Sequence, residues 1–205
     1  MKKQLLIFAI ALTLLNACTK SVLKETIFEE DPDYPGLPVH SNMGYNTFGA
    51  YFNDKVFSIE TYGSDRPFYI VADREGLDIS LSGNLQGHRG HVNLTFNLPV
   101  DESCTIETYH DLSFLDSLTF SIDTIPFTCQ IEITGDTATE IQSVYGGHIS
   151  FDAVKQVIVD KEIAELVLSG KFQFRVFTTN GTRLDVTGGR FDLGIDATNF
   201  VNFRR

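Results

Sequence analysis

The sequence predicts an all-β protein, folded as an antiparallel β-sandwich or a partly closed barrel. The chain has 205 residues, of which 42% are hydrophobic, and this is enough for one domain with a sizeable core. It contains 17 Phe, 7 Tyr and no Trp. Phenylalanine fits a half-buried pleated surface, so this composition favours a core built between strands.

Alternation of apolar and polar residues is the second observation that predicts strands. A period of two marks a strand with one dry face and one wet face. The alternating segments are GLDISLSGNL (76–85), HVNLTFNLP (91–99), SLTFSID (117–123) and TCQIEIT (128–134). The residues expected to face the core are Leu77, Ile79, Leu81, Val92, Leu94, Phe96, Leu98, Leu118, Phe120, Ile122, Cys129, Ile131 and Ile133. The segment YHDLSFLDSL (109–118) predicts one short helical turn.

The C-terminal part predicts one long hairpin from about residue 163 to 197. A three-residue loop that ends at Gly181, in the left-handed conformation, places all apolar residues on one side. The parity of apolar positions then changes, and a β-bulge at Gly188-Gly189 absorbs the extra residue. The predicted pairs are Phe172 with Gly188, Phe174 with Val186, Val176 with Leu184, Phe191 with Gly170, Leu193 with Leu168 and Ile195 with Leu166. These glycines are therefore interpreted as structural, since a phosphate cradle requires glycines that lead into a helix. Gly146-Gly147 predicts a second bulge of this kind, with His148 and Ser150 facing away from Ile149 and Phe151.

The first residues are expected to be an export signal. Met1-Lys2-Lys3 is basic, and the apolar run Leu5–Leu15 is too short to span a bilayer. The run ends in LNAC, which resembles the lipobox of bacterial lipoproteins. The resemblance implies lipidation of Cys18 and removal of residues 1–17. The alternative is an ordinary secretory signal with a chance cysteine.

The net charge and the composition of the N-terminal part predict the partners of the protein and its domain organisation. Loss of Lys2 and Lys3 on maturation changes the net charge from −11 to −13, which disfavours nucleic acid as a partner. The lipid on Cys18 is then the expected contact with the membrane. Residues 18–43 hold the acidic, proline-rich run EEDPDYPGLPVHSN and are expected to form an extended tether before a domain at 44–205.

Two cysteines remain once Cys18 is assigned to lipidation. Cys104 and Cys129 form an even pair, which in an exported protein fits a disulfide. Two separate thiols fit equally well, and the sequence leaves both alternatives open.

Three stretches resemble a family of uncharacterised Bacteroidetes lipoproteins. They are NTFGAYFNDKVF near the start of the domain, GGHISFDAV in the middle and LSGKFQFRVFTTNGTRLDVTGGRFDLGI at the end. The resemblance covers most of the chain after the tether and departs from the family pattern at Asp54, where glycine is preferred. It implies the all-β fold, the lipid anchor and a location in the bacterial envelope, at the periplasmic or the surface face of the outer membrane. It carries over no catalytic residue.

Candidate chemical groups are dispersed along the chain. His88 and His91 lie in a predicted hairpin turn and His110 lies downstream, a spacing that does not build a metal site, so neither metal nor cofactor is expected. The many carboxylates have no spacing that selects a catalytic pair. Asp192, beside Arg190 in GGRFD, is interpreted as a salt link or turn cap. An arginine and aromatic residues in predicted loops and rims suggest a ligand surface made of Tyr62, Arg66, Tyr69 and Tyr109.

The expected function is that of a membrane-anchored envelope lipoprotein, a non-catalytic module that binds a glycan, a peptide or a protein partner. The absence of a nucleophile elbow or a Cys–His pair favours this over an enzyme. The alternative is an envelope glycan hydrolase that uses a carboxylate pair. A hydrolase requires converging carboxylates, one with a raised pKa, whereas a binding module requires an exposed aromatic patch.

Overall fold

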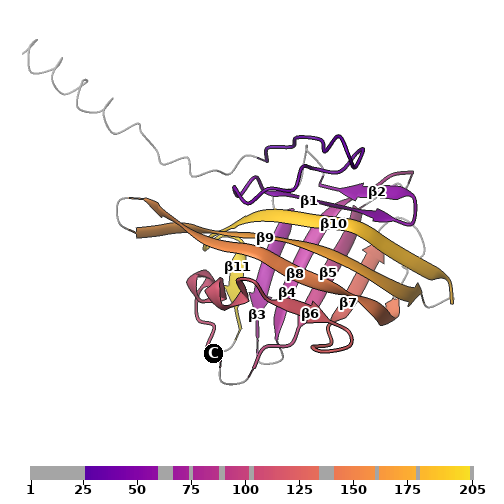
Figure 1. The fold of residues 1–205 in the computed structure, drawn as a ribbon. Coiled ribbons are helices and arrows are strands. Elements are labelled where there is room, and N and C mark those ends of the chain that lie inside the picture. Colours follow the sequence, from indigo (N-terminus) through magenta and orange to yellow (C-terminus); the bar gives the residue numbers. More distant parts are fainter. Residues whose placement is uncertain are drawn as a thin grey trace, which may run out of the picture.

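The computed structural model describes residues 26–59, 67–73, 76–87, 91–101, 104–133, 141–159, 162–178 and 181–203. The described part is almost entirely β-structure (Figure 1), with one short 3₁₀ helix, η1. The first seven elements are β1 (Thr47–Phe52), β2 (Lys55–Ser58), β3 (Phe68–Ala72), β4 (Leu77–Leu85), β5 (His91–Leu98), η1 (Tyr109–Leu115) and β6 (Thr119–Ser121). The remaining strands are β7 (Thr128–Ile133), β8 (Ile141–Val159), β9 (Glu162–Thr178), β10 (Arg183–Ile195) and β11 (Phe200–Asn202).

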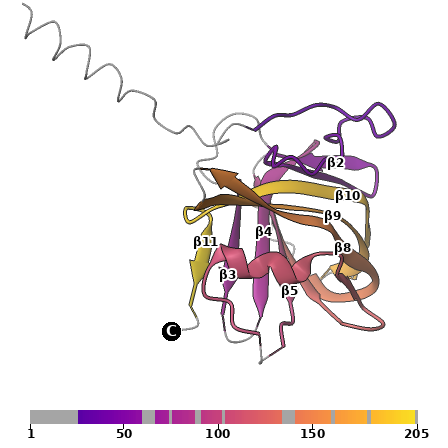
Figure 2. The ribbon, with the colours of Figure 1, turned by 60° about the vertical axis from the view of Figure 1, so that its left-hand side comes forward.

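All of these strands belong to one strongly curled sheet that forms a half-barrel (Figure 2). The sheet runs in the order β11-β3-β4-β2-β1-β10-β9-β8-β6, and β5 and β7 extend it from β4. Every strand pair is antiparallel except β11 with β3. The all-β prediction is confirmed, and of its two architectures the partly closed barrel is the one observed. No helix of the described ranges has the length and apolar character needed to cross a bilayer.

The core fills the inside of the curl and is rich in phenylalanine. Phe96 of β5 contacts Phe172 and Phe174 of β9, with ring centroids 5.0 and 5.7 Å apart. Edge-to-face rings at such distances add to the stabilisation that burial itself provides. The predicted inward positions of β4 and β5 are all buried, as are Phe120, Cys129 and Ile131. The predicted helical turn is η1, which buries Leu112 and Leu115.

No disulfide joins Cys104 and Cys129, both of which the structure describes. Cys129 is buried on β7 opposite Phe96, and burial raises the pKa of its thiol well above the usual value. Cys104 lies in the segment between β5 and η1 and is half-buried against the core. Of the two alternatives that the sequence leaves open, the structure has the separate cysteines.

The C-terminal hairpin has the predicted register. Leu184 lies opposite Val176, and Ile195 lies opposite Leu166 at the far end. Gly181 has φ +80°, as a left-handed loop residue requires. One predicted pair is wrong, because Phe172 lies opposite Gly189 rather than Gly188. Gly188 itself takes the left-handed conformation, with φ +63°, and therefore belongs to the bulge. The second bulge is present but lies one residue earlier than Gly146-Gly147, because the register shifts between Val144 and Gly146 and leaves Tyr145 as the extra residue.

The segment before β1 differs from the expected tether. Residues 26–46, called here the N-terminal segment, lie against the outer face of β10 and β1 (Figure 1). Leu37 is fully buried, and Glu30 forms a β-bridge with Pro38. Prolines and acids typical of a solvated stalk here form turns that are held by specific bonds to the sheet. The extended tether predicted over 18–43 is wrong for residues 26–43, and residues 18–25 lie outside the described residues.

The bulge glycines generate a stability prediction. A Cβ at Gly189 would lie 2.3 Å from the Phe172 ring and 2.4 Å from its carbonyl oxygen, whereas a Cβ at Gly181 meets nothing within 4 Å. We expect Gly189→Ala to cost about 3 kcal/mol of unfolding free energy through steric overlap. Gly181→Ala should cost only about 1 kcal/mol for its left-handed backbone. Urea titration of both variants measures the difference, and equal losses would contradict this account of the bulge.

Candidate functional site

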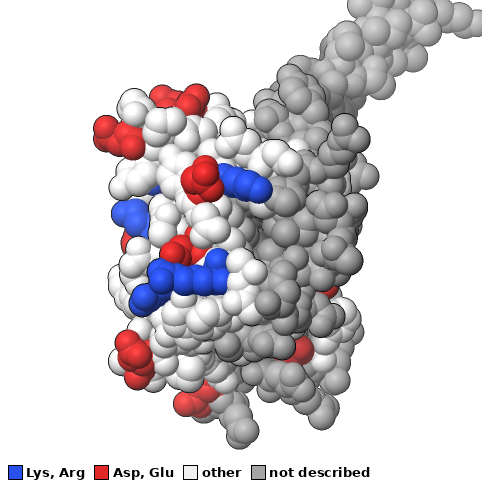
Figure 3. Space-filling model, turned by 90° about the vertical axis from the view of Figure 1, so that its right-hand side faces the viewer, with Lys and Arg blue, Asp and Glu red and all other residues white. Residues whose placement is uncertain are grey.

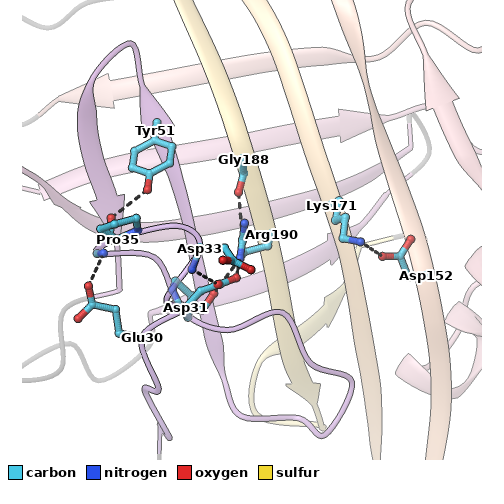
Figure 4. A network of polar contacts seen from close by, with 11 residues as sticks. Glu30, Asp31, Asp33, Pro35, Tyr51, Asp152, Lys171, Gly188 and Arg190 are labelled. Atoms are coloured by element: carbon cyan, nitrogen blue, oxygen red, sulfur yellow. Dashed lines mark hydrogen bonds and ion pairs between the residues drawn. The ribbon is translucent and has the colours of Figure 1, made fainter.

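The N-terminal segment is held to the sheet by a half-buried ion pair (Figure 4). Arg190 of β10 donates from Nη1 to a carboxylate oxygen of Asp31, and from Nε to the Gly188 carbonyl at 3.1 Å. Its guanidinium also lies 4.2 Å from the ring centre of Tyr34. The backbone N–H of Asp33 and the charge of Arg190 lower the pKa of Asp31 below its usual value. The positive charge of Arg190 is therefore balanced by the carboxylate of Asp31 within the protein.

Asp192 provides the second attachment of this segment. Its carboxylate is buried and accepts hydrogen bonds from the Ser41 hydroxyl and from three successive backbone N–H groups. The backbone donors are Met43 at 3.1 Å, Gly44 at 2.8 Å and Tyr45 at 3.2 Å. Charge-assisted bonds of this kind are stronger than neutral ones. The interpretation of Asp192 as a turn cap is confirmed, and its partner is the N-terminal segment rather than Arg190.

Two adjacent hollows lie on the outer face of β8, β9 and β10. We call them together the outer groove, since both are lined by Gln173 of β9. The first has a volume of about 440 Å³ and is lined by Asp31, Tyr34, His40, His148, Lys171, Phe172, Gln173, Gly188, Gly189 and Arg190. The second has a volume of about 320 Å³ and is lined by Gly146, Gly147, Gln173, Phe174, Arg175, Arg183, Asp185, Val186 and Thr187. The glycines of both bulges thus form part of the floor of the outer groove.

Aromatic and cationic side chains meet at the second hollow. Tyr145 of β8 and Phe177 of β9 are exposed and stack on each other, with ring centroids 4.5 Å apart. Arg175 lies 5.5 Å from the Tyr145 ring centre. Exposed aromatic pairs beside a polar hollow are typical of ligand surfaces. Figure 3 shows that cationic and acidic side chains lie next to each other on one face of the molecule.

The carboxylates around the groove are engaged by cations or histidine. Asp185 accepts from Arg183 at 2.9 Å and 2.7 Å through both of its oxygens. Asp152 lies 3.6 Å from Lys171 Nζ and 3.0 Å from His40 Nε2. Burial, with a contribution from Lys171, lowers the pKa of His40, so its ring is neutral at pH 7. This arrangement suits recognition of polar groups better than proton transfer by a carboxylic acid.

A carboxyl with a strongly raised pKa lies elsewhere, beneath the N-terminal segment. Glu165 of β9 is 3% exposed, and the backbone of Gly44 lies over it. Burial, together with the charges of Asp196 and Asp192, raises the pKa of Glu165 to about 7. Its Oε2 atom has no hydrogen-bond partner among the described residues. A substrate cannot reach so enclosed a group, so Glu165 does not supply the carboxylate pair of a hydrolase.

The residues that the sequence predicted as site candidates lie on different elements of the structure. Tyr69 lies exposed on β3, while Tyr109 lies in η1, where burial and the charges of Asp196 and Glu165 raise its pKa. Tyr62, Arg66, His88 and Cys18 lie outside the described residues. His91 is on β5 and His110 contacts the Tyr109 ring in η1. The described ranges contain no group of three or more His, Cys, Asp or Glu side chains that could hold a metal ion. A ligand surface at Tyr69 and Tyr109 stays a prediction.

The outward side chains of β9 leave a signal of the groove in the sequence. In FQFRVF, the inward positions Phe172, Phe174 and Val176 leave Gln173, Arg175 and Phe177 facing outward. An outward phenylalanine beside an arginine is unusual on a solvated strand face. Tyr145 and the contacts of the N-terminal segment depend on long-range pairing and had no such signal.

Comparison with known proteins identifies no relative: no family model, no curated protein and no solved structure matches the chain. The resemblance to Bacteroidetes lipoproteins therefore stays a prediction, and the function is argued from the geometry alone.

The buried Glu165 carboxyl predicts a pH dependence of stability. Its pKa in the folded protein, about 7, lies above the ordinary value of 4.5. The folded state therefore binds this proton more tightly, and the resulting stabilisation is complete below about pH 4.5 and lost as the pH rises through about 7. Relative to a Glu165→Gln variant, the native protein should lose about 1–3 kcal/mol of unfolding free energy between pH 5 and pH 8.

Urea unfolding at the two pH values measures this loss. Glu132→Gln, a substitution at an exposed position of β7, is the matched control and should follow the native protein. Parallel pH profiles of the native protein and Glu165→Gln would show that Glu165 titrates normally, and would contradict the predicted pH dependence of stability.

Proposed function

We propose that the chain is a lipid-anchored lipoprotein of the bacterial cell envelope that binds a glycan without catalysis in the outer groove. The observation that carries the proposal is the exposed Tyr145–Phe177 stack beside an open, polar hollow. Flat aromatic rings offer an apolar surface to a sugar ring, while Gln173, Thr187 and Asp185 offer partners to its hydroxyl groups. The anchor rests on the N-terminal basic residues, the apolar run and Cys18.

A binding role agrees better with the groove than hydrolysis does. Asp31, Asp152 and Asp185 each lie beside a cation, and the backbone N–H of Asp33 and the charge of Arg190 lower the pKa of Asp31. A glycosidase needs one carboxylic acid that holds its proton near neutral pH. The one carboxyl with a strongly raised pKa among the described residues is Glu165, which is enclosed by the N-terminal segment.

Binding is tested with the full-length protein, purified in a mild detergent and run by affinity electrophoresis through gels that contain plant, algal or bacterial polysaccharides. At least one polysaccharide should retard the native protein. Phe177→Ala and Tyr145→Ala should weaken that retardation about tenfold, because they remove the stacking surface beside the second hollow. Failure of every polysaccharide to retard the protein would refute glycan binding.

Tyr69→Ala is the matched control for these two variants. It removes an aromatic side chain that is as exposed as Phe177, at 41%, but lies on β3. Retardation should be unchanged. Loss of binding in Tyr69→Ala with retention in Phe177→Ala would instead place the ligand on the surface that the sequence predicted.

The anchor is tested by Cys18→Ser. Without the thiol, the cysteine cannot be lipidated, and a protein with no other strong membrane contact should leave the membrane. We expect the native protein in the membrane fraction of the producing bacterium and the variant in the soluble fraction. A variant that remains membrane-bound, or a native protein that lacks the mass of bound acyl chains, would contradict the proposed lipidation.

A further inference from the structure

The positive charge of Arg175 is not balanced by an ion pair with another described residue. In the sheet register it lies opposite Asp185 of β10 and Gly146 of β8. Asp185, however, is bonded through both carboxylate oxygens by Arg183. Among the described residues Arg175 makes no ion pair, and its guanidinium lines the second hollow beside the Tyr145 ring. An arginine in this position is available for an anion, to which it can donate two parallel hydrogen bonds.

The net positive charge of the outer groove is unusual in this acidic chain. The chain as a whole has a net charge of −11. Around the outer groove, in contrast, four cationic side chains face three carboxylates. They are Lys171, Arg175, Arg183 and Arg190, against Asp31, Asp152 and Asp185. The groove therefore retains one positive charge in an acidic protein, and Arg175 carries it.

The position of the groove on the face of the sheet decides the class of ligand. The floor belongs to β8, β9 and β10, and β9 is paired along both edges, with β8 and with β10. A peptide that adds a strand requires unpaired N–H and C=O groups at a sheet edge, and the floor of this groove lies between paired strands. A sugar chain needs only flat rings and side-chain hydrogen-bond partners. The glycines of both bulges also allow a flat ring to approach the backbone closely.

We propose that the ligand of the outer groove is an acidic glycan, a chain of sugars that carry carboxylates, with one carboxylate bound by Arg175 and an adjoining ring stacked on Phe177. This inference rests on the proposed function and adds the charge of the ligand to it. Gly146 contributes to the geometry, since a Cβ there would lie 2.9 Å from the Arg175 guanidinium. The glycine thus leaves room for the guanidinium to lie across β8.

The test compares acidic oligosaccharides with their carboxyl-reduced forms. The probes are oligomers of galacturonate, alginate and hyaluronan, each beside the same oligomer with its carboxylates reduced to alcohols, titrated calorimetrically into the full-length protein in detergent. At least one acidic oligomer should bind, and its reduced form should bind about tenfold more weakly, which corresponds to about 1.4 kcal/mol. Arg175→Met should abolish this difference, so that the acidic oligomer and its reduced form bind the variant with equal affinity.

Lys155→Met is the matched control. It removes an exposed cation further along β8, opposite Val167, and should change neither affinity. Equal binding of the acidic and reduced forms would overturn the acidic ligand and leave glycan binding intact. An equal loss in Lys155→Met and Arg175→Met would also overturn it, because attraction would then be non-specific. If neither form of any oligomer binds, while a neutral polysaccharide retards the protein in gels, the acidic ligand is refuted alone; if no glycan binds in either assay, both proposals fail.

Discussion

The structure depends on the bending of three long strands around a phenylalanine core. β8, β9 and β10 span 19, 17 and 13 residues, far more than a flat strand in a small sheet can use. Gly147 and Gly189 flank Phe174 and Phe172 on either side of β9, and at both glycines a Cβ would overlap the backbone of β9. The paired bulges let the outer strands coil while β9 keeps one alternation of inward and outward residues around Phe172 and Phe174. The inward residues meet Phe96 across the curl.

The same bulges account for the outer groove. Where side chains are missing from a sheet face, the face is hollowed, and here four glycines lie on the two strands that flank Gln173. The N-terminal segment deepens the first hollow by supplying Asp31, Tyr34 and His40 as a wall. Its attachment combines polar contacts, through Arg190 and Asp192, with the burial of Leu37. Three buried atoms beneath or within it have no hydrogen-bond partner among the described residues: His40 Nδ1, Glu165 Oε2 and Ser169 Oγ.

Local patterns predicted much of this fold, since strand alternation and glycine placement act between near neighbours. The register of the C-terminal hairpin follows from parity alone, because an even-to-odd change of apolar positions must be absorbed by a bulge. The tether failed for the opposite reason. Its prolines and acids are typical of solvated chain, and the residues that capture it, Arg190 and Asp192, are more than a hundred positions away. The groove was not predicted because alternation identifies the inward residues, whereas the groove is lined mainly by outward ones such as Gln173 and Arg175.

Glycan binding and hydrolysis differ in the state of the carboxylates, and the structure separates those carboxylates by location. Those beside the groove lie next to cations, as Asp185 does beside Arg183, so they act as fixed acceptors. Glu165 and Asp192 are enclosed by the N-terminal segment. Asp192 caps a loop of that segment, and Glu165 has a raised pKa. A raised pKa marks a catalytic acid only when a substrate can reach the proton. At Glu165 it reports instead the electrostatic cost of covering a polar sheet face with a chain segment, which is a property of folding.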